Sequence, residues 1–92
     1  MRLHEVASLL SLNLKVEASC LADLSRRPAW SAKFDYVEVK DGPILTSAYG
    51  LGNTPRQAML DYIKQITGKD LVYHACSTDR RREFKIPAGV KP

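Results

Sequence analysis

The spacing of hydrophobic and polar positions changes several times along the chain, and each change marks an expected element. Over residues 3–10 apolar residues recur at the three- and four-residue spacing of one helix face, which predicts a short helix. Over residues 12–18 they alternate with polar residues, which is typical of a strand. Residues 33–39 are rich in aromatic and β-branched side chains, so they predict a second strand.

A tight hairpin is expected after residue 39. Asp41-Gly42 supplies residues that tolerate positive φ, as a short hairpin turn demands. Pro43 has no N–H to give to a strand pair, so the return strand is expected to start at Ile44 and to run to Tyr49. Gly50-Leu51-Gly52 then predicts a turn that leads into the next helix.

The helix expected over residues 55–67 is the element with the clearest signals. Thr54 can cap its first turn, Gln57 completes a capping box, and Pro55 occupies a position where its missing N–H costs nothing. Gly68 fits the left-handed position that closes a helix. One face of the helix is apolar and predicts its buried side, formed by Ala58, Met59, Tyr62, Ile63 and Ile66.

Two more strand-like runs follow the helix. Residues 71–76 and 83–86 each predict a strand, and in the second run Phe84 and Ile86 alternate with Glu83 and Lys85. The charged residues 77–82 between the two runs predict a loop. Residues 87–92, which are rich in proline and glycine, predict a frayed tail.

This order of elements predicts a single α+β domain over residues 1–92. We expect a small antiparallel sheet with the helix near residues 55–67 packed on one face, and a short N-terminal helix. The hairpin, helix and second hairpin of residues 33–87 form the well-marked unit, whereas residues 1–32 form a less clearly specified N-terminal segment.

Composition narrows the class of protein without naming a reaction. The 92 residues carry a formal net charge of +4, which permits contact with nucleic acid or another acidic partner but does not require it. No apolar run approaches the roughly 20 residues that span a bilayer, so a soluble, cytoplasmic protein without a membrane partner is expected. Cys20 and Cys76 are expected to be reduced, buried thiols, with a single disulfide between them as the open alternative.

His74 and Cys76 are the residues closest to a chemical motif. They lie two apart in an expected strand and would share a face. A metal site would need two further ligands, such as His4 and Cys20, and a nucleophile would need a positioned base. The spacing signals neither, so we expect a packed histidine and a buried thiol. No catalytic residue, metal site or cofactor is predicted, and a small hydrolase is the least favoured class.

Gly50-x-Gly52 before a helix also invites comparison with phosphate-binding loops. The pattern lacks the further glycine or the Gly-Lys-Ser/Thr ending of the nucleotide-binding fingerprints, and Pro55 removes an amide that such a loop would use. We interpret it as a turn followed by a helix cap.

The arginine run is the strongest candidate for a binding surface. Arg80, Arg81 and Arg82 lie at an expected hairpin tip, where guanidinium groups can clamp phosphates or pair with acidic side chains. Arg27 and Trp30 are expected to extend this surface, with the indole stacking on a base or filling a pocket. The alternative is that a charged tip keeps the sheet edge from aggregating.

Two resemblances involve the same half of the chain. The run from Gly52 to Ala58 (Gly-Asn-Thr-Pro-Arg-Gln-Ala), following a hairpin, resembles the hairpin-to-helix passage of HicB-type antitoxins, whose fold is a partial RNase H domain. A wider pattern resembles small proteins encoded by phages and prophages, and this implies an accessory role such as masking a host defence complex. The motifs of this wider pattern are Asp41-Gly42, Tyr49-Gly50-x-Gly52-x-Thr54-Pro55, Asp61-Tyr62, Gly68-Lys69 and Arg82-Glu83-Phe84-x-x-Pro87. They are structural motifs, so neither resemblance assigns a functional role to any residue of this sequence.

These observations favour a non-enzymatic interaction protein. The phage resemblance implies an inhibitor of the anti-CRISPR or another counter-defence type, which would sterically mask a host protein or ribonucleoprotein in the host cytoplasm. The alternative is a small nucleic-acid-binding regulator or antitoxin-like module, whose affinity would fall steeply with salt.

Overall fold

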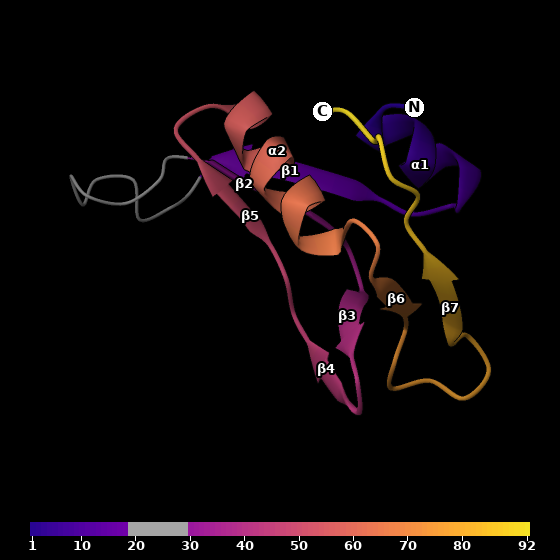
Figure 1. The fold of residues 1–92 in the computed structure, drawn as a ribbon. Helices are drawn as coiled ribbons and strands as arrows, with labels where there is room; N and C mark the ends of the chain where they lie inside the picture. Colours follow the sequence, from indigo (N-terminus) through magenta and orange to yellow (C-terminus); the bar gives the residue numbers. More distant parts are fainter. Residues whose placement is uncertain (19–29) are drawn as a thin grey trace.

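The computed structural model of the protein describes residues 1–18 and 30–92. Two helices and two small antiparallel sheets give the α+β fold that the sequence predicts, including the short N-terminal helix (Figure 1). In chain order the elements are α1 (Leu3–Leu9), β1 (Leu14–Ala18), β2 (Trp30–Phe34), β3 (Val37–Asp41), β4 (Ile44–Thr46), β5 (Gly50–Gly52), α2 (Pro55–Ile66), β6 (Asp70–Tyr73) and β7 (Arg82–Lys85).

The strands are divided between two sheets instead of forming one. A three-stranded sheet has the order β1-β2-β5, and a four-stranded sheet has the order β4-β3-β6-β7. Helix α2 packs on the three-stranded sheet, mainly against β5 and β2, which confirms that the main helix covers one face of a sheet (Figure 1). No helix in the two described ranges is long and apolar enough to cross a bilayer.

The strand predicted over residues 33–39 is interrupted. β2 ends at Phe34 in the three-stranded sheet, and β3 begins at Val37 in the four-stranded sheet. Between them Tyr36 has a positive φ of 61°, which turns the chain out of one sheet and into the other. The prediction of one continuous strand was wrong because the side chains favour a strand on both sides of this turn.

The chain crosses back between the sheets after β4. The return strand of the hairpin starts at Ile44, as predicted, but it ends at Thr46 instead of Tyr49. Residues 47–49 make the crossing, and Gly50-Leu51-Gly52 forms β5 instead of the predicted turn. The glycine run is thus an edge strand that pairs with β2.

Gly50 and Gly52 let β5 lie directly against the backbone of α2. A Cβ atom at Gly50 would stand 2.0 Å from the carbonyl oxygen of Ala58, and one at Gly52 would stand 2.5 Å from the Ala58 nitrogen. The helix also closes the outer edge of this strand, because the Leu51 N–H donates to Asp61 Oδ2 at 2.9 Å. The Gly-x-Gly pattern therefore serves close packing between strand and helix.

The start of α2 has the predicted Thr54 cap, but the reciprocal half of the predicted capping box is shifted by one residue, because Gln57 accepts the N–H of Asn53 and not that of Thr54. The Gln57 N–H donates to Thr54 Oγ1 at 3.1 Å, and the Asn53 N–H donates to Gln57 Oε1 at 3.0 Å. The predicted apolar face is also confirmed, since Ala58, Tyr62, Ile63 and Ile66 are buried and Met59 is half-buried. Gly68 closes the helix region with a φ of 74°, as expected.

Tyr62 joins the helix to the end of β2. Its hydroxyl accepts the Phe34 N–H at 3.1 Å, and the two rings meet edge to face with centroids 5.6 Å apart. This N–H lies beyond the last pair between β2 and β5, Ala32 with Gly50, so no strand satisfies it. Burial raises the pKa of Tyr62, although the hydrogen bond from Phe34 opposes the effect.

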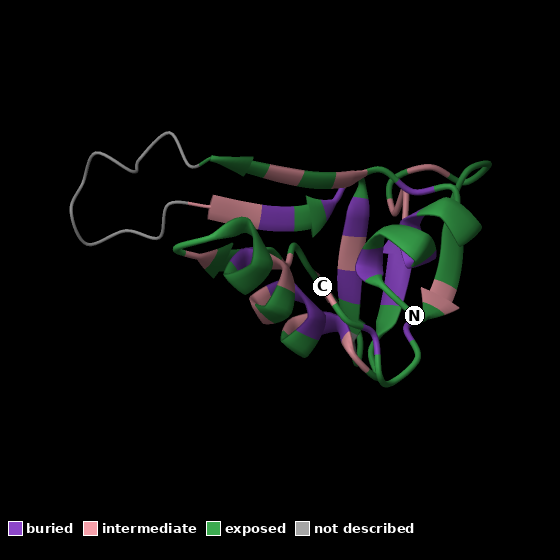
Figure 2. Cartoon of the chain, turned by 90° about the horizontal axis from the view of Figure 1, so that it is seen from above, coloured by how far each residue is buried: buried purple, intermediate pink, exposed green. Residues whose placement is uncertain are grey.

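The C-terminal segment is anchored, so the prediction of a frayed tail over residues 87–92 was wrong. Ile86 and Val90 are buried in the same core as Leu3 of α1. The two ends of the chain lie close together (Figure 2). Two backbone hydrogen bonds hold the segment against the N-terminus: the Leu3 N–H donates to the Lys91 carbonyl at 2.7 Å, and the Lys91 N–H donates to the Met1 carbonyl at 2.9 Å. The prediction failed because proline and glycine disfavour regular structure but do not prevent packing.

We predict that Gly50→Ala lowers the free energy of unfolding by at least about 3 kcal/mol, since backbone atoms of α2 occupy the space of the new methyl group. The matched control is Gly89→Ala, where a Cβ atom meets nothing within 4 Å and only the left-handed backbone is strained. It should cost about 1 kcal/mol. Urea unfolding of both variants measures the difference, and equal losses would contradict the close approach of β5 to α2.

Tyr62→Phe should cost about 1–3 kcal/mol at pH 7, because it leaves the buried Phe34 N–H without an acceptor. The folded wild-type protein favours the neutral phenol, so above the ordinary tyrosine pKa of 10.0 the unfolded chain ionises first and stability falls. The variant lacks this loss. The difference in unfolding free energy between the wild-type protein and Tyr62→Phe should therefore decrease as the pH rises above 10.0. A difference that stays constant with pH in urea unfolding would contradict a raised pKa of Tyr62 in the folded protein.

Candidate functional site

A groove of about 430 Å³ opens where the chain crosses between the two sheets. Both crossings line it: residues 36–38 with Lys33 on one side, and residues 47–49 on another. Residues 74–77, which follow β6, complete the lining. We call this site the aromatic groove, because Tyr36, Tyr49 and His74 contribute its large side chains.

A row of rings begins at Tyr36 and His74 in the groove lining and continues outside the groove to Tyr73 and Arg82. The Tyr36 and His74 rings stack with centroids 5.0 Å apart, and the His74 ring meets Tyr73 edge to face at 4.2 Å. The Arg82 guanidinium carbon lies 4.8 Å from the centroid of the Tyr73 ring. Such contacts contribute about 0.5–1.5 kcal/mol each, so the row holds its rings in fixed orientations.

The backbone at this site is strained in two places. Tyr36 and His74 have φ values of 61° and 52°, in the left-handed region that non-glycine residues rarely adopt. The His74 N–H donates to the Tyr36 carbonyl at 3.0 Å, which couples the two positions. Strain of this kind costs of order 1–3 kcal/mol and clusters at functional sites.

The tyrosines of the aromatic groove are unusually open to solvent. Tyr36 is 70% exposed and Tyr49 is 52% exposed, although both are large and partly apolar. Exposed aromatic side chains around a concavity are typical of a surface that a partner covers. Sequence reasoning did not select either tyrosine, because strand propensity explained both residues equally well.

The three predicted arginines have different surroundings. Arg82 Nη2 donates to the Leu10 carbonyl at the C-terminal end of α1, at 3.1 Å, in addition to its contact with the Tyr73 ring. Arg80 and Arg81 are exposed and belong to the loop that continues from the groove lining at residues 74–77. We call these two residues the arginine pair. All three side chains are exposed, but their contacts differ: Arg82 links β7 to the end of α1, whereas the Arg81 guanidinium reaches only the nearby Ala75 carbonyl, at 3.5 Å. The arginine pair is therefore the part of the run that is more open to a partner.

Trp30 does not join this surface. It is the half-buried first residue of β2, paired with Ala18 and Gly52. This end of the three-stranded sheet lies at the side of the molecule opposite the loop between β6 and β7 (Figure 1). Arg27, the other residue predicted to extend the arginine surface, lies outside the described residues, and so does Cys20.

His74 and Cys76 do not share a strand. β6 ends at Tyr73, so both residues follow it in the segment that lines the groove. Cys76 is an exposed free thiol, and the prediction that it is buried was wrong because the strand stops three residues earlier. In the parts of the chain that the structure describes, no group of three or more His, Cys, Asp and Glu side chains could hold a metal ion.

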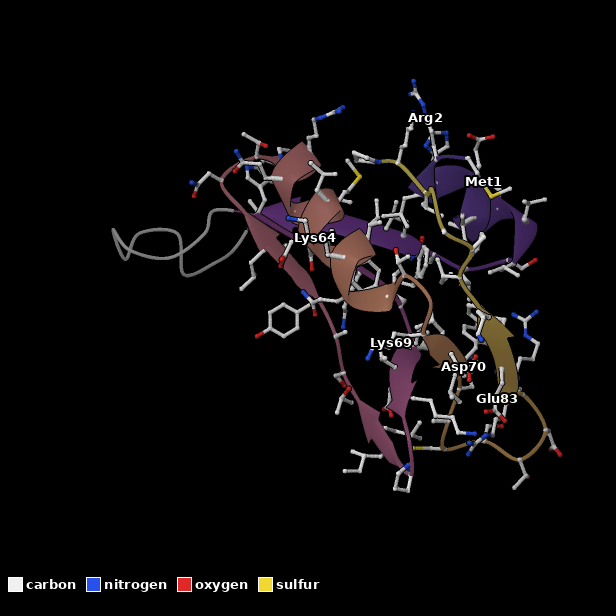
Figure 3. All side chains as sticks on the ribbon, in the orientation of Figure 1. Met1, Arg2, Lys64, Lys69, Asp70 and Glu83 are labelled. Atoms are coloured by element: carbon white, nitrogen blue, oxygen red, sulfur yellow. The ribbon has the colours of Figure 1, made fainter. Side chains whose placement is uncertain are left out.

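The outer face of the four-stranded sheet carries balanced charge. Lys40 Nζ and Glu83 Oε1 form an ion pair at 2.9 Å, and Val72 on the intervening strand is fully buried. The hydrogen bond from Lys40, together with its charge, lowers the pKa of the Glu83 carboxyl. Asp70 and Glu83 project from the neighbouring strands β6 and β7 (Figure 3). This mixture of charges is what a solvated face requires.

No protein-family model matches the chain, and neither the curated proteins nor the solved structures give a match. The resemblances to phage proteins and to HicB-type antitoxins therefore remain predictions.

We predict that Arg82→Ala lowers the free energy of unfolding by about 1–2 kcal/mol, because the Leu10 carbonyl and the Tyr73 ring lose their cation. The double variant Arg80→Ala/Arg81→Ala should stay within about 0.5 kcal/mol of the wild-type protein, since the hydrogen bond that it removes, from Arg81 Nη1 to the Ala75 carbonyl, is long at 3.5 Å and stays within one exposed loop. Thermal unfolding monitored by circular dichroism compares them. Equal stabilities for all three proteins would remove the structural role given to Arg82.

Proposed function

We propose that this protein is a non-enzymatic interaction protein that binds a host protein or ribonucleoprotein through the aromatic groove and the arginine pair. The exposure of Tyr36 and Tyr49 around the groove is the observation that carries this proposal. Tyrosine and arginine are enriched among the residues that dominate binding energy at protein interfaces, and such residues fill pockets at the centre of the contact.

The geometry suits recognition by a preformed surface. The stacked Tyr36 and His74 rings are held by their neighbours and by the hydrogen bond between their backbones, so little ordering is needed when a partner binds. Arg80 and Arg81 add guanidinium groups that pair with carboxylates or phosphates at the edge of the contact. An inhibitor that masks its target sterically needs such a surface and no catalytic reaction. This fits the anti-CRISPR or other counter-defence role that the phage resemblance implies.

A second candidate function is nucleic-acid binding by a small regulator or antitoxin-like module. The observation that favours it is the presence of Lys33 in the groove lining with the exposed Tyr36 and Tyr49, and of Arg81, whose guanidinium reaches the Ala75 carbonyl of that lining at 3.5 Å. Single-stranded nucleic acid is bound by this combination, in which bases stack on rings and cations follow the backbone. Binding through several phosphates would make affinity fall steeply with salt, whereas a protein surface would give a weaker dependence.

The test is affinity capture from a lysate of the natural host, followed by calorimetry with the identified partner. Tyr36→Asn removes the ring but keeps a residue that tolerates positive φ, and Tyr49→Ala removes the second ring. Each should weaken binding by roughly 30-fold, the effect expected of a central interface residue. Leu9→Ala is the matched control, because Leu9 is 69% exposed and lies outside the groove.

Unchanged affinity in both tyrosine variants would reject the aromatic groove as the binding surface. A filter-binding titration with single-stranded RNA at several salt concentrations separates the two candidate functions. Tight binding that falls by orders of magnitude with salt, and that is lost in Tyr36→Asn, would favour the nucleic-acid module over the protein partner.

A further inference from the structure

A second pocket, of about 440 Å³, shares no residue with the aromatic groove. It lies where α2 meets the paired N- and C-terminal segments. Leu60, Val90 and Pro92 form its apolar part, and Arg2, Arg56 and Lys91 form its polar part. No aspartate or glutamate lines it. The pocket therefore gathers three cations beside apolar surface.

The backbone fixes two of these cations next to each other. Arg2 and Lys91 are partners in a parallel bridge, held by the hydrogen bonds that join Lys91 to Met1 and Leu3. Arg2 projects from the start of α1 beside the C-terminal segment (Figure 3). The side chains of both residues are exposed, so an anion that binds here would meet two positive charges that the backbone places next to each other.

The third cation comes from the first turn of α2. Arg56 is exposed, and together with Leu60 one turn later it brings the helix into the pocket lining. None of the three cations takes part in an ion pair in the described ranges, where the ion pairs are Lys15–Glu17 and Lys40–Glu83. Glu5 accepts the backbone N–H of Arg2 at 2.9 Å and does not line the pocket.

We propose that Arg2, Arg56 and Lys91 form a binding site for a phosphate-type oxyanion. Guanidinium groups match the oxygen pairs of a phosphate, and the lysine ammonium adds a compact positive charge. The apolar surface of Leu60 and Val90 adjoins the three cations in the pocket lining. The three cations outnumber the single α-carboxylate that Pro92 would bring as a terminal residue. The site is independent of the protein partner proposed for the aromatic groove.

The experiment is a titration of the ¹⁵N-labelled protein with inorganic phosphate, followed by NMR and compared with chloride at equal ionic strength. We expect saturable shifts of the backbone amides of residues 2, 56, 60, 90 and 91. Arg56→Gln should weaken binding by about tenfold, because a charge-assisted hydrogen bond is lost. Lys64→Gln is the matched control: it removes the same charge from an exposed position of the same helix, outside the pocket (Figure 3).

Lys64→Gln should leave the affinity within about twofold of the wild-type value, since a distant surface charge is screened by salt. Equal weakening by both glutamine variants, or the absence of saturable shifts in the wild-type protein, would overturn the site. A parallel titration with a short thymidine oligonucleotide shows whether a phosphodiester binds more tightly at the same amides than free phosphate does. Retained phosphate binding in Tyr36→Asn would separate this site from the aromatic groove.

Discussion

The contact between β5 and α2, with no side chain between the two backbones, determines much of the structure. Because Gly50 and Gly52 have no Cβ atom, the helix lies low on the three-stranded sheet. Because the helix is so close to the sheet, the Tyr62 hydroxyl can accept the hydrogen bond of the Phe34 N–H. Strand β5 offers no acceptor there, since its last pair with β2 is Gly50 with Ala32. The helix thus completes the hydrogen bonding of β2 at the residue where the chain leaves the sheet. The aromatic groove opens at this crossing, although no residue of α2 lines it.

Elements with local signals were predictable from the sequence. The helix start at Thr54 and Pro55 and the hairpin near Asp41-Gly42 each depend on residues within a few positions of one another. The turn itself lies one residue later than predicted: Asp41 pairs with Ile44, and Gly42 and Pro43 form the turn, with a φ of 61° at Gly42. The division of the strands between two sheets was not predictable in this way. A residue such as Tyr36 or Val37 favours a strand in either sheet, and only pairing with distant partners decides which sheet it joins.

In the candidate site, too, features with local signals were predictable and features that depend on distant contacts were not. The charge run selected Arg80 and Arg81, which are exposed as expected, but it could not show that Arg82 contacts Leu10, a residue 72 positions away in the sequence. The exposure of Tyr36 and Tyr49 was not predictable from the sequence, because nothing in the neighbouring residues distinguishes an exposed tyrosine from a buried one. Trp30 was assigned to the arginine surface from residue type alone, and the order of the strands separates them.

The bridge between Arg2 and Lys91 joins positions that are separated by almost the entire chain. Closing so long a loop has a large entropic cost, so this pairing is expected to form late, after the local helices and hairpins. An incompletely folded or nascent polypeptide therefore does not place Arg2 next to Lys91, and its positive charges remain dispersed. The capacity to concentrate charge in one place is acquired only when folding is complete.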